Sequence, residues 1–296
     1  MTNYKPQVSL LLSVLPEVAK ETCFALHGGT SINLLVRDMP RLSVDIDLTY
    51  VPLEDRKTSF ENITKALERI KGNIATVVPN AKVMHKQDEL KLQISQGQAQ
   101  IKLEVNQAMR GTISPSIKMI LCEKAQEVYD AFCEINVVPI GQLYGGKICA
   151  ALDRQHPRDL FDIKYLLENE GFAYEIKKGF LFGLLSSKRP IHEMLSPHLL
   201  DQRSAMANQF EGMSDESFTY EDFETTRNLL IQTIHENLTD TDKEFLLRFE
   251  SGTPDWSLYN FENYPAVQWK LQNLQKLKET NPKKHGEQLK KLKSKF

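Results

Sequence analysis

The alternating segment SVDIDLTYV at residues 43–51 constrains the fold of this chain more than any other feature. Its apolar residues alternate with polar ones, and a period of two is typical of a strand with one buried face. Asp is disfavoured in strands, yet Asp45 and Asp47 both stand on the polar side of this one. Metal ions, a positively charged partner or exposure to water must compensate for these two carboxylates.

A glycine pair precedes this strand. The run TCFALHGGTSINLLV predicts a short strand, a corner at Gly28 and Gly29, and a helix over residues 30–37 that Thr30 or Ser31 is expected to cap. Without Cβ atoms the backbone of the corner can approach a phosphate closely, and the N–H groups of a following helix point at such an anion. The Thr30 and Ser31 hydroxyls are expected to add donors.

A third carboxylate is expected beside the aspartate pair. Residues 99–106 alternate in the same way, and Glu104 lies on their polar side. If this strand lies next to the other, Glu104 joins Asp45 and Asp47, because neighbouring strands are only about 4.8 Å apart. Three such anions repel one another unless cations lie between them. A pair of Mg²⁺ ions would fit and would support in-line nucleotidyl transfer.

A second cluster of charged residues follows on two helices. Lys147 and Arg154 are seven residues apart, so they share one face of a helix. His156 is expected to cap the next helix, which begins with a proline. Asp159 and Asp162 then lie three apart in its first turns, where acidic residues are also favoured for structural reasons.

The remaining pattern predicts an N-terminal half of mixed helices and strands and a helical C-terminal half. Helices are expected over 7–20 and 59–78 and from residue 140 onward, and strands over 82–87, 90–95 and INVVP. From residue 172 to the end the signals are helical. We therefore predict two domains, residues 1–170 and 171–296.

Composition favours a cytoplasmic protein. Of the 296 residues 41% are hydrophobic and 26% charged, as in soluble globular chains. No apolar run approaches the roughly 20 residues that span a membrane, and the N-terminus lacks the pattern of a signal peptide. The four cysteines form no CxxC pair, which disfavours a zinc site and favours free thiols in a reducing compartment.

Taken together, GGTSINLLVRDMPRLSVDIDL and GQLYGGKICAALDRQHPRDLFDIKYLL resemble the AbiEii/AbiGii toxins of the DNA polymerase β-like nucleotidyltransferase superfamily. The resemblance covers about residues 20–170. It implies an α/β (α+β) fold, in which a polymerase β-like nucleotidyltransferase domain with a mixed sheet precedes a helical domain, with the active site in the cleft between them. It also implies that Lys147 contacts nucleotide phosphates, that Asp159 belongs to the active site and that Arg41 contacts phosphate or orients a carboxylate. Asp162 is expected to be structural.

The resemblance further implies a reaction. The chain would transfer NMP from an NTP to an acceptor hydroxyl with Mg²⁺, releasing pyrophosphate, and the acceptor would be the 3′ end of a tRNA. A cognate antitoxin protein encoded nearby would be its partner. A nucleotidyltransferase that modifies a small molecule such as an antibiotic, or a protein side chain, would use the same parts. A non-catalytic binding module is disfavoured because Asp45, Asp47 and Lys147 are all present.

The C-terminal tail is strongly basic within a chain of net charge −2. Residues 270–296 hold nine lysines against two glutamates, and their leucines are spaced for helices on either side of NPKKHG. Two interpretations stay open. The lysines contact an RNA acceptor, or they form a solvated helix face.

Overall fold

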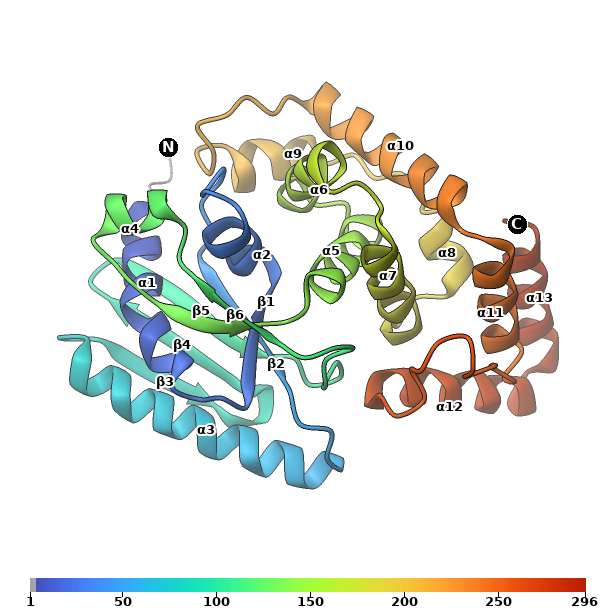
Figure 1. Cartoon of the computed structure of the whole chain (residues 1–296), viewed down its shortest axis with the longest axis horizontal. Helices are drawn as coiled ribbons and strands as arrows, with labels where there is room; N and C mark the ends of the chain where they lie inside the picture. Colours follow the sequence, from blue (N-terminus) through green and yellow to red (C-terminus); the bar gives the residue numbers. More distant parts are fainter. Residues whose placement is uncertain (1–3) are drawn as a thin grey trace. The chain divides into compact units, whose positions relative to one another are not determined.

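The computed structural model describes residues 4–296 and divides into two compact units (Figure 1). The sheet unit comprises Met1–Pro139 and Phe210–Ser217, and the helical unit comprises Ile140–Gln209 and Phe218–Phe296. This division differs from the predicted boundary near residue 170. Residues 1–3, which the prediction includes in the first domain, lie outside the described residues.

A seven-stranded mixed sheet forms the centre of the sheet unit, in the order β3-β4-β5-β2-β1-β7-β6. The strands are β1 Phe24–His27, β2 Asp45–Tyr50, β3 Lys82–Lys86, β4 Lys91–Gln96, β5 Ala99–Val105, β6 Ile117–Ile120 and β7 Glu134–Val137. β2 runs antiparallel to β1 and parallel to β5. The sequence predicted every strand but β6, which is short and largely exposed.

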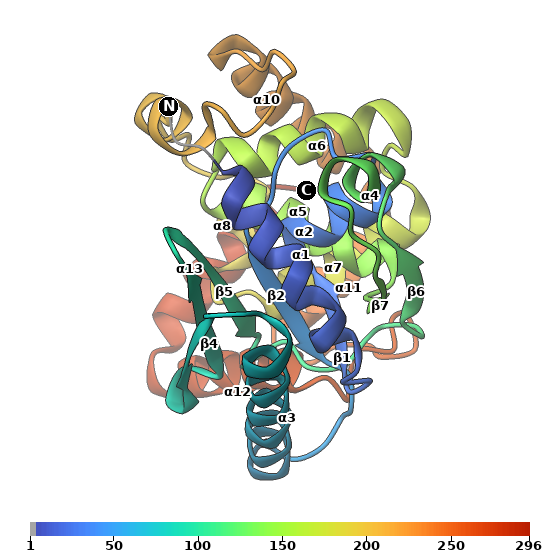
Figure 2. The ribbon, with the colours of Figure 1, turned by 90° about the vertical axis from the view of Figure 1, so that its left-hand side faces the viewer.

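Two long helices cover one face of this sheet and lie side by side there (Figures 1 and 2). They are α1 Lys5–Ala19 and α3 Arg56–Val77. The unit also contains α2 Gly28–Ser31, η1 Ile32–Val36, η2 Gln87–Glu89 and α4 Glu123–Tyr129. The inward-facing apolar side chains of β2 and β5 are buried in the core, with Ile46 and Leu48 fully covered, as the alternation predicted.

The helical unit, residues 140–209 and 218–296, contains no strand. Residues 210–217, here called the strap, belong to the sheet unit and form no strand either. The helices of the helical unit are α5 Ile140–Asp153, α6 Pro157–Asn169, α7 Tyr174–Ser186, α8 Ile191–Leu195, α9 Arg203–Ala205, η3 Met206–Phe210, α10 Tyr220–Asn237, α11 Asp240–Glu250, α12 Pro265–Thr280 and α13 Pro282–Lys293.

A close crossing of α5 and α7 explains why the helical unit begins at residue 140. A Cβ on Gly145 would overlap the backbone of Gly179, and a Cβ on Gly179 would overlap the backbone of Gly141. The absence of these side chains lets the two helix backbones touch. α5 is therefore part of the helical unit, although the sequence motif that contains it suggested membership of the first domain.

The lysine-rich tail folds as α12 and α13, with Asn281 capping α13 through its side chain. Leu292 is fully buried, so α13 is packed on the unit. One lysine differs from the expected outward orientation. Lys270 is 9% exposed, and a buried ammonium group requires hydrogen-bond partners. It donates hydrogen bonds to the carbonyls of Leu184 and Arg189. Burial lowers the pKa of Lys270 to about 8.

Two further expectations concern the chain as a whole. Within residues 4–296, no helix is both long and apolar enough to cross a membrane. The four cysteines are free thiols in the described chain, and Cys133 is buried.

Candidate active site

The aspartate pair stands at the start of β2. Asp45 and Asp47 are half-buried, while Ile46 and Leu48 on the opposite face are fully buried. In the sheet register Asp47 pairs with His27 of β1 and with Glu104 of β5. The structure thus places the three carboxylates on adjacent strands, which is the condition on which the expected third carboxylate depended.

Glu104 already has a cationic partner of its own. Its carboxylate forms an ion pair with Lys91, which lies opposite it on β4. The hydrogen bond to Glu104 raises the pKa of Lys91, and the charge of Asp45 contributes in the same direction. In the part of the chain that the structure describes, no three His, Cys, Asp or Glu side chains gather closely enough to hold a metal ion. Metal binding by Glu104 therefore stays a prediction, and this pairing argues against it.

The glycine corner packs directly against the site. Gly28 has a φ of +77°, and a Cβ there would stand 2.6 Å from Oδ2 of Asp47. A Cβ on Gly29 would stand 2.8 Å from Nη2 of Arg41 and 3.2 Å from Oγ of Ser43. At distances below 3 Å one of the two atoms must shift. A side chain at Gly28 would displace the Asp47 carboxylate and strain the backbone, and one at Gly29 would displace the end of the Arg41 side chain. The corner leaves room for Asp47 on one side and for Arg41 on the other.

The expected capping of the next helix is wrong. The helix begins at Gly28, with His27 in an extended conformation at its N-cap, and it continues into the π-helical turn η1. Thr30 and Ser31 lie within it and are fully buried. Thr30 Oγ1 lies 2.9 Å from Ser43 Oγ and 2.5 Å from the carbonyl of Asp45, whereas the Ser31 hydroxyl donates to the carbonyl of Gly28 at 3.2 Å.

The Thr30 contacts tie the corner to the aspartate strand, and the Ser31 bond stays within the corner. Because both hydroxyls have partners inside the protein, contacts of Thr30 and Ser31 with a nucleotide stay predictions. His27 Nδ1 lies 3.0 Å from the Thr49 hydroxyl, a further contact between β1 and β2.

The helical unit holds the second group of predicted residues in a buried ion cluster. Lys147 Nζ lies 2.9 Å from Oδ1 of Asp159 and 2.9 Å from Oδ2 of Asp162. These three side chains are 6%, 1% and 1% exposed. Arg154 adds two hydrogen bonds to Asp159, at 2.6 and 3.0 Å.

Charge pairing dominates the electrostatics of this cluster. Burial by itself would raise the pKa of Asp159, but the charges of Lys147 and Arg154 outweigh it and hold the pKa well below its usual range. Asp159 is therefore ionised at neutral pH, and it fixes the ammonium group of Lys147 together with Asp162.

The start of α6 places Asp159 in this cluster. His156 caps the helix, with its Nδ1 accepting the N–H of Arg158 at 3.1 Å, and Pro157 occupies the first helical turn. The predicted capping role of His156 is confirmed. Burial lowers the pKa of His156, which favours the neutral ring that such an acceptor requires.

Sequence reasoning missed Lys91. The sequence SQGQ at residues 95–98 contained the signal for it. A two-residue turn between Gln96 and Ala99 sets the register of the hairpin, and counting back from that turn pairs Lys91 with Glu104.

A match to a known protein family spans both groups of candidate residues, the glycine corner with the aspartate pair and the buried ion cluster. A family model described as "Nucleotidyl transferase AbiEii toxin, Type IV TA system" matches residues 9–273. Among solved structures, MenT4, a nucleotidyltransferase toxin from Mycobacterium tuberculosis H37Rv, is similar with a TM-score of 0.64 and 13% sequence identity. The match covers 91% of this chain and 92% of that chain, and at this identity it shows the fold. Curated protein sequences give no match.

Proposed function

Because the chain belongs to the AbiEii family of nucleotidyltransferase toxins of type IV toxin–antitoxin systems, we propose that it transfers NMP from an NTP to the 3′ end of a tRNA. The family implies an NTP substrate and an antitoxin partner. The tRNA acceptor and Mg²⁺ are parts of the proposal. The reaction would take place in the cytoplasm, where NTP and tRNA are found.

The observation that carries this proposal is the pair Asp45 and Asp47 on one face of β2, directly beside Gly28. Mg²⁺ binds proteins through one or two carboxylates and completes its shell with water and substrate phosphates, so these two side chains fit it. We propose both as its ligands. When bound, Mg²⁺ would neutralise phosphate charge and polarise the P–O bond that breaks.

The chain's own residues would bind and orient the triphosphate. The open corner at Gly28 and Gly29 allows the backbone to approach a phosphate, and the guanidinium of Arg41 lies next to Gly29. The acceptor hydroxyl oxygen would form a bond to the α-phosphorus while the bond from phosphorus to pyrophosphate breaks. Pyrophosphate then leaves, and the hydroxyl proton is released to water.

We propose that Lys147 neutralises phosphate charge during this step. A buried ammonium held by two carboxylates is fixed in position before substrate arrives, and a fixed charge stabilises a transition state better than a mobile one. Asp159 and Asp162 would then orient Lys147 without touching the nucleotide.

The test is transfer by the purified full-length chain. Each NTP, labelled at its α-phosphate, is incubated with the protein, Mg²⁺ and total cellular RNA, and the labelled products are separated. We expect label in tRNA-sized RNA that a 3′ exonuclease releases. Label in a protein band or a small molecule would contradict the tRNA acceptor, and absence of labelled product with every NTP and acceptor fraction would contradict the transfer itself.

A further inference from the structure

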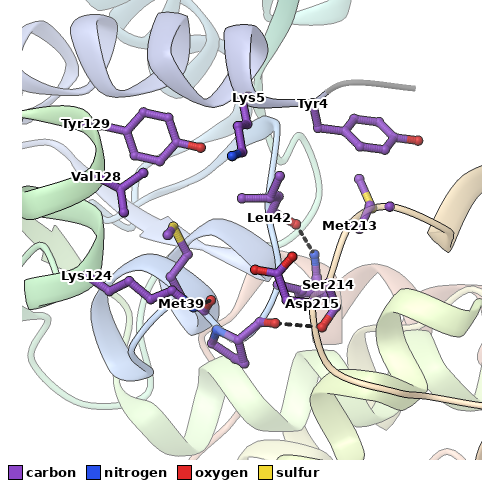
Figure 3. Close-up of a pocket in the computed structure, with 13 residues that line it drawn as sticks. Tyr4, Lys5, Met39, Leu42, Lys124, Val128, Tyr129, Met213, Ser214 and Asp215 are labelled. Atoms are coloured by element: carbon purple, nitrogen blue, oxygen red, sulfur yellow. Dashed lines mark hydrogen bonds between the residues drawn. The ribbon is translucent and has the colours of Figure 1, made fainter. Parts of the chain in front are cut away.

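Residues 37–44 form the segment that leads from η1 into the aspartate strand β2, and a distant part of the chain holds this segment in place. The strap, Phe210–Ser217, leaves the helical unit, packs within the sheet unit and then returns. Its Met213 carbonyl accepts the N–H of Leu42 at 2.6 Å, and its Ser214 hydroxyl donates to the carbonyl of Pro40 at 2.8 Å (Figure 3). These bonds flank Arg41 on both sides.

Arg41 is buried and points at the proposed nucleotide corner. It is 3% exposed, its Nη2 is the atom nearest to a Cβ built on Gly29, and its Nη1 donates to the carbonyl of Leu42 at 2.9 Å. The Leu42 residue is thus held at its carbonyl by Arg41 and at its N–H by Met213. A shift of this backbone would therefore either break the bond from Arg41 to Leu42 or move the guanidinium with it.

This backbone does not hold its conformation by itself. Met39 has a φ of +52°, which costs free energy in a residue with a side chain and persists only where surrounding contacts impose it. Its N–H donates to the Asn33 carbonyl at 2.9 Å, and its own carbonyl lies 3.4 Å from Lys124 Nζ.

There is also room for the segment to move. A pocket of about 180 Å³ lies against it, and Figure 3 shows strap residues and segment residues along its wall. Close packing therefore does not fix the segment on this side, and hydrogen bonds have a larger share in holding it. Met213 is 2% exposed and anchors the strap, while Ser214 is fixed by accepting the N–H of Glu216 at 3.0 Å.

We propose that Ser214 is a positioning residue for nucleotide binding: its bond to Pro40, next to the bond of Met213 to Leu42, holds Arg41 at the glycine corner. The inference rests on the proposed function, in which Arg41 contacts the triphosphate. A contact made equally in the ground state and the transition state changes KM and leaves kcat alone. Loss of one hydrogen bond should then raise the KM for NTP about fivefold.

The experiment compares Ser214→Ala with Ser217→Ala in the full-length chain. Ser217 is an exposed serine of the same strap, so its replacement is a matched control. We expect Ser214→Ala to raise the KM for NTP about fivefold with kcat within twofold, and Ser217→Ala to change neither. Ser214→Thr, which keeps the hydroxyl, should restore the KM.

Two readouts separate positioning from general stability. In an Arg41→Ala background, Ser214→Ala should raise the KM no further, because the residue through which it acts is gone. Amide hydrogen exchange of Leu42 should become faster in Ser214→Ala.

Three results would overturn the inference: additive effects of Ser214→Ala and Arg41→Ala on the KM, unchanged amide exchange of Leu42, or equal effects of Ser214→Ala and Ser217→Ala. A wild-type chain that neither binds nor uses NTP would instead overturn the proposed function, while the exchange of Leu42 would still report on the strap.

Discussion

Gly28 and Asp47 are so close that a Cβ on Gly28 would stand 2.6 Å from Oδ2 of Asp47. Gly28→Ala must therefore displace this carboxylate, and it also strains a backbone with a φ of +77°. We expect NMP transfer to fall at least tenfold and the free energy of unfolding to fall by about 1–2 kcal/mol. Transfer kinetics and urea unfolding of the same preparation measure both.

Gly97 provides the matched control. It also has a positive φ, +57°, but a Cβ there would meet open space. Gly97→Ala should cost a similar free energy from backbone strain alone and leave transfer unchanged. If the two variants lost transfer equally, the contact between Gly28 and Asp47 would have no part in activity.

The buried cluster predicts that Lys147 is required for stability as well as for turnover. Lys147→Ala leaves the carboxylates of Asp159 and Asp162 without their shared ammonium, and removing one partner of a buried ion pair costs about 3–5 kcal/mol. Urea unfolding should show this loss. Adding Asp162→Asn to Lys147→Ala should recover part of it, since one uncompensated charge is then removed. An unfolding free energy unchanged in Lys147→Ala would contradict the cluster as described.

The depressed pKa of Asp159 predicts a dependence of stability on pH. Because its folded pKa lies below the unfolded value of about 3.9, folding favours the ionised form. The resulting stability is complete above pH 3.9 and is lost as the pH falls below it. Wild type should therefore lose stability more steeply between pH 4 and about 2 than Asp159→Asn does. Parallel curves from the two proteins in thermal unfolding across this range would argue against the depressed pKa.

The sequence predicted the local parts of the site well. Alternation placed Asp45 and Asp47 on one face of a strand and Glu104 on the polar side of another, because side-chain direction in a strand follows a period of two. That the two strands are neighbours is shown by the sheet register. The motif of the second group likewise placed Lys147 and Arg154 on one helix and Asp159 and Asp162 at the start of the next. The ion pair between Lys147 and Asp159 is a finding of the structure. The predicted features depend on residues close together in the chain or on regular strand geometry.

The long-range packing could not be predicted from local sequence patterns. The backbone contact of Gly145 with Gly179 assigns α5 to the helical unit, and no local pattern pairs those two residues. The bond from Ser214 to Pro40 joins residues 174 positions apart through a side chain and a carbonyl, neither of which leaves a periodic signal. Which partner a buried hydroxyl such as that of Thr30 selects also depends on the assembled fold.

The two open interpretations of the lysine-rich tail, RNA contact and a solvated face, can be separated at the exposed lysines of α13. The expectations below are those of RNA contact. Leu292 is buried beneath them, so removing the helix would disturb the unit, and substitution is the better test. Lys290→Gln with Lys291→Gln should weaken RNA binding, and the slope of log affinity against log salt should become shallower by about 0.7–0.9 per lost phosphate contact. Fluorescence anisotropy with labelled tRNA at several salt concentrations measures the slope.

Two exposed lysines of α3 control for net charge. Lys57→Gln with Lys65→Gln removes the same charge from the sheet unit and should leave the slope as in wild type. If both double variants shifted RNA affinity equally, the effect would be one of overall charge. If neither did, the tail would be a solvated face.

The most direct test of the two-carboxylate mechanism is NMP transfer by Asp45→Asn and Asp47→Asn, with Asp88→Asn as control. Asn keeps the shape of each side chain and removes its charge, and Asp88 is an exposed aspartate outside the site. Each site variant should lose transfer at least about 100-fold at saturating Mg²⁺, with thermal unfolding close to that of wild type, while Asp88→Asn keeps full activity. Wild-type transfer rates in a stably folded Asp47→Asn chain would contradict the account.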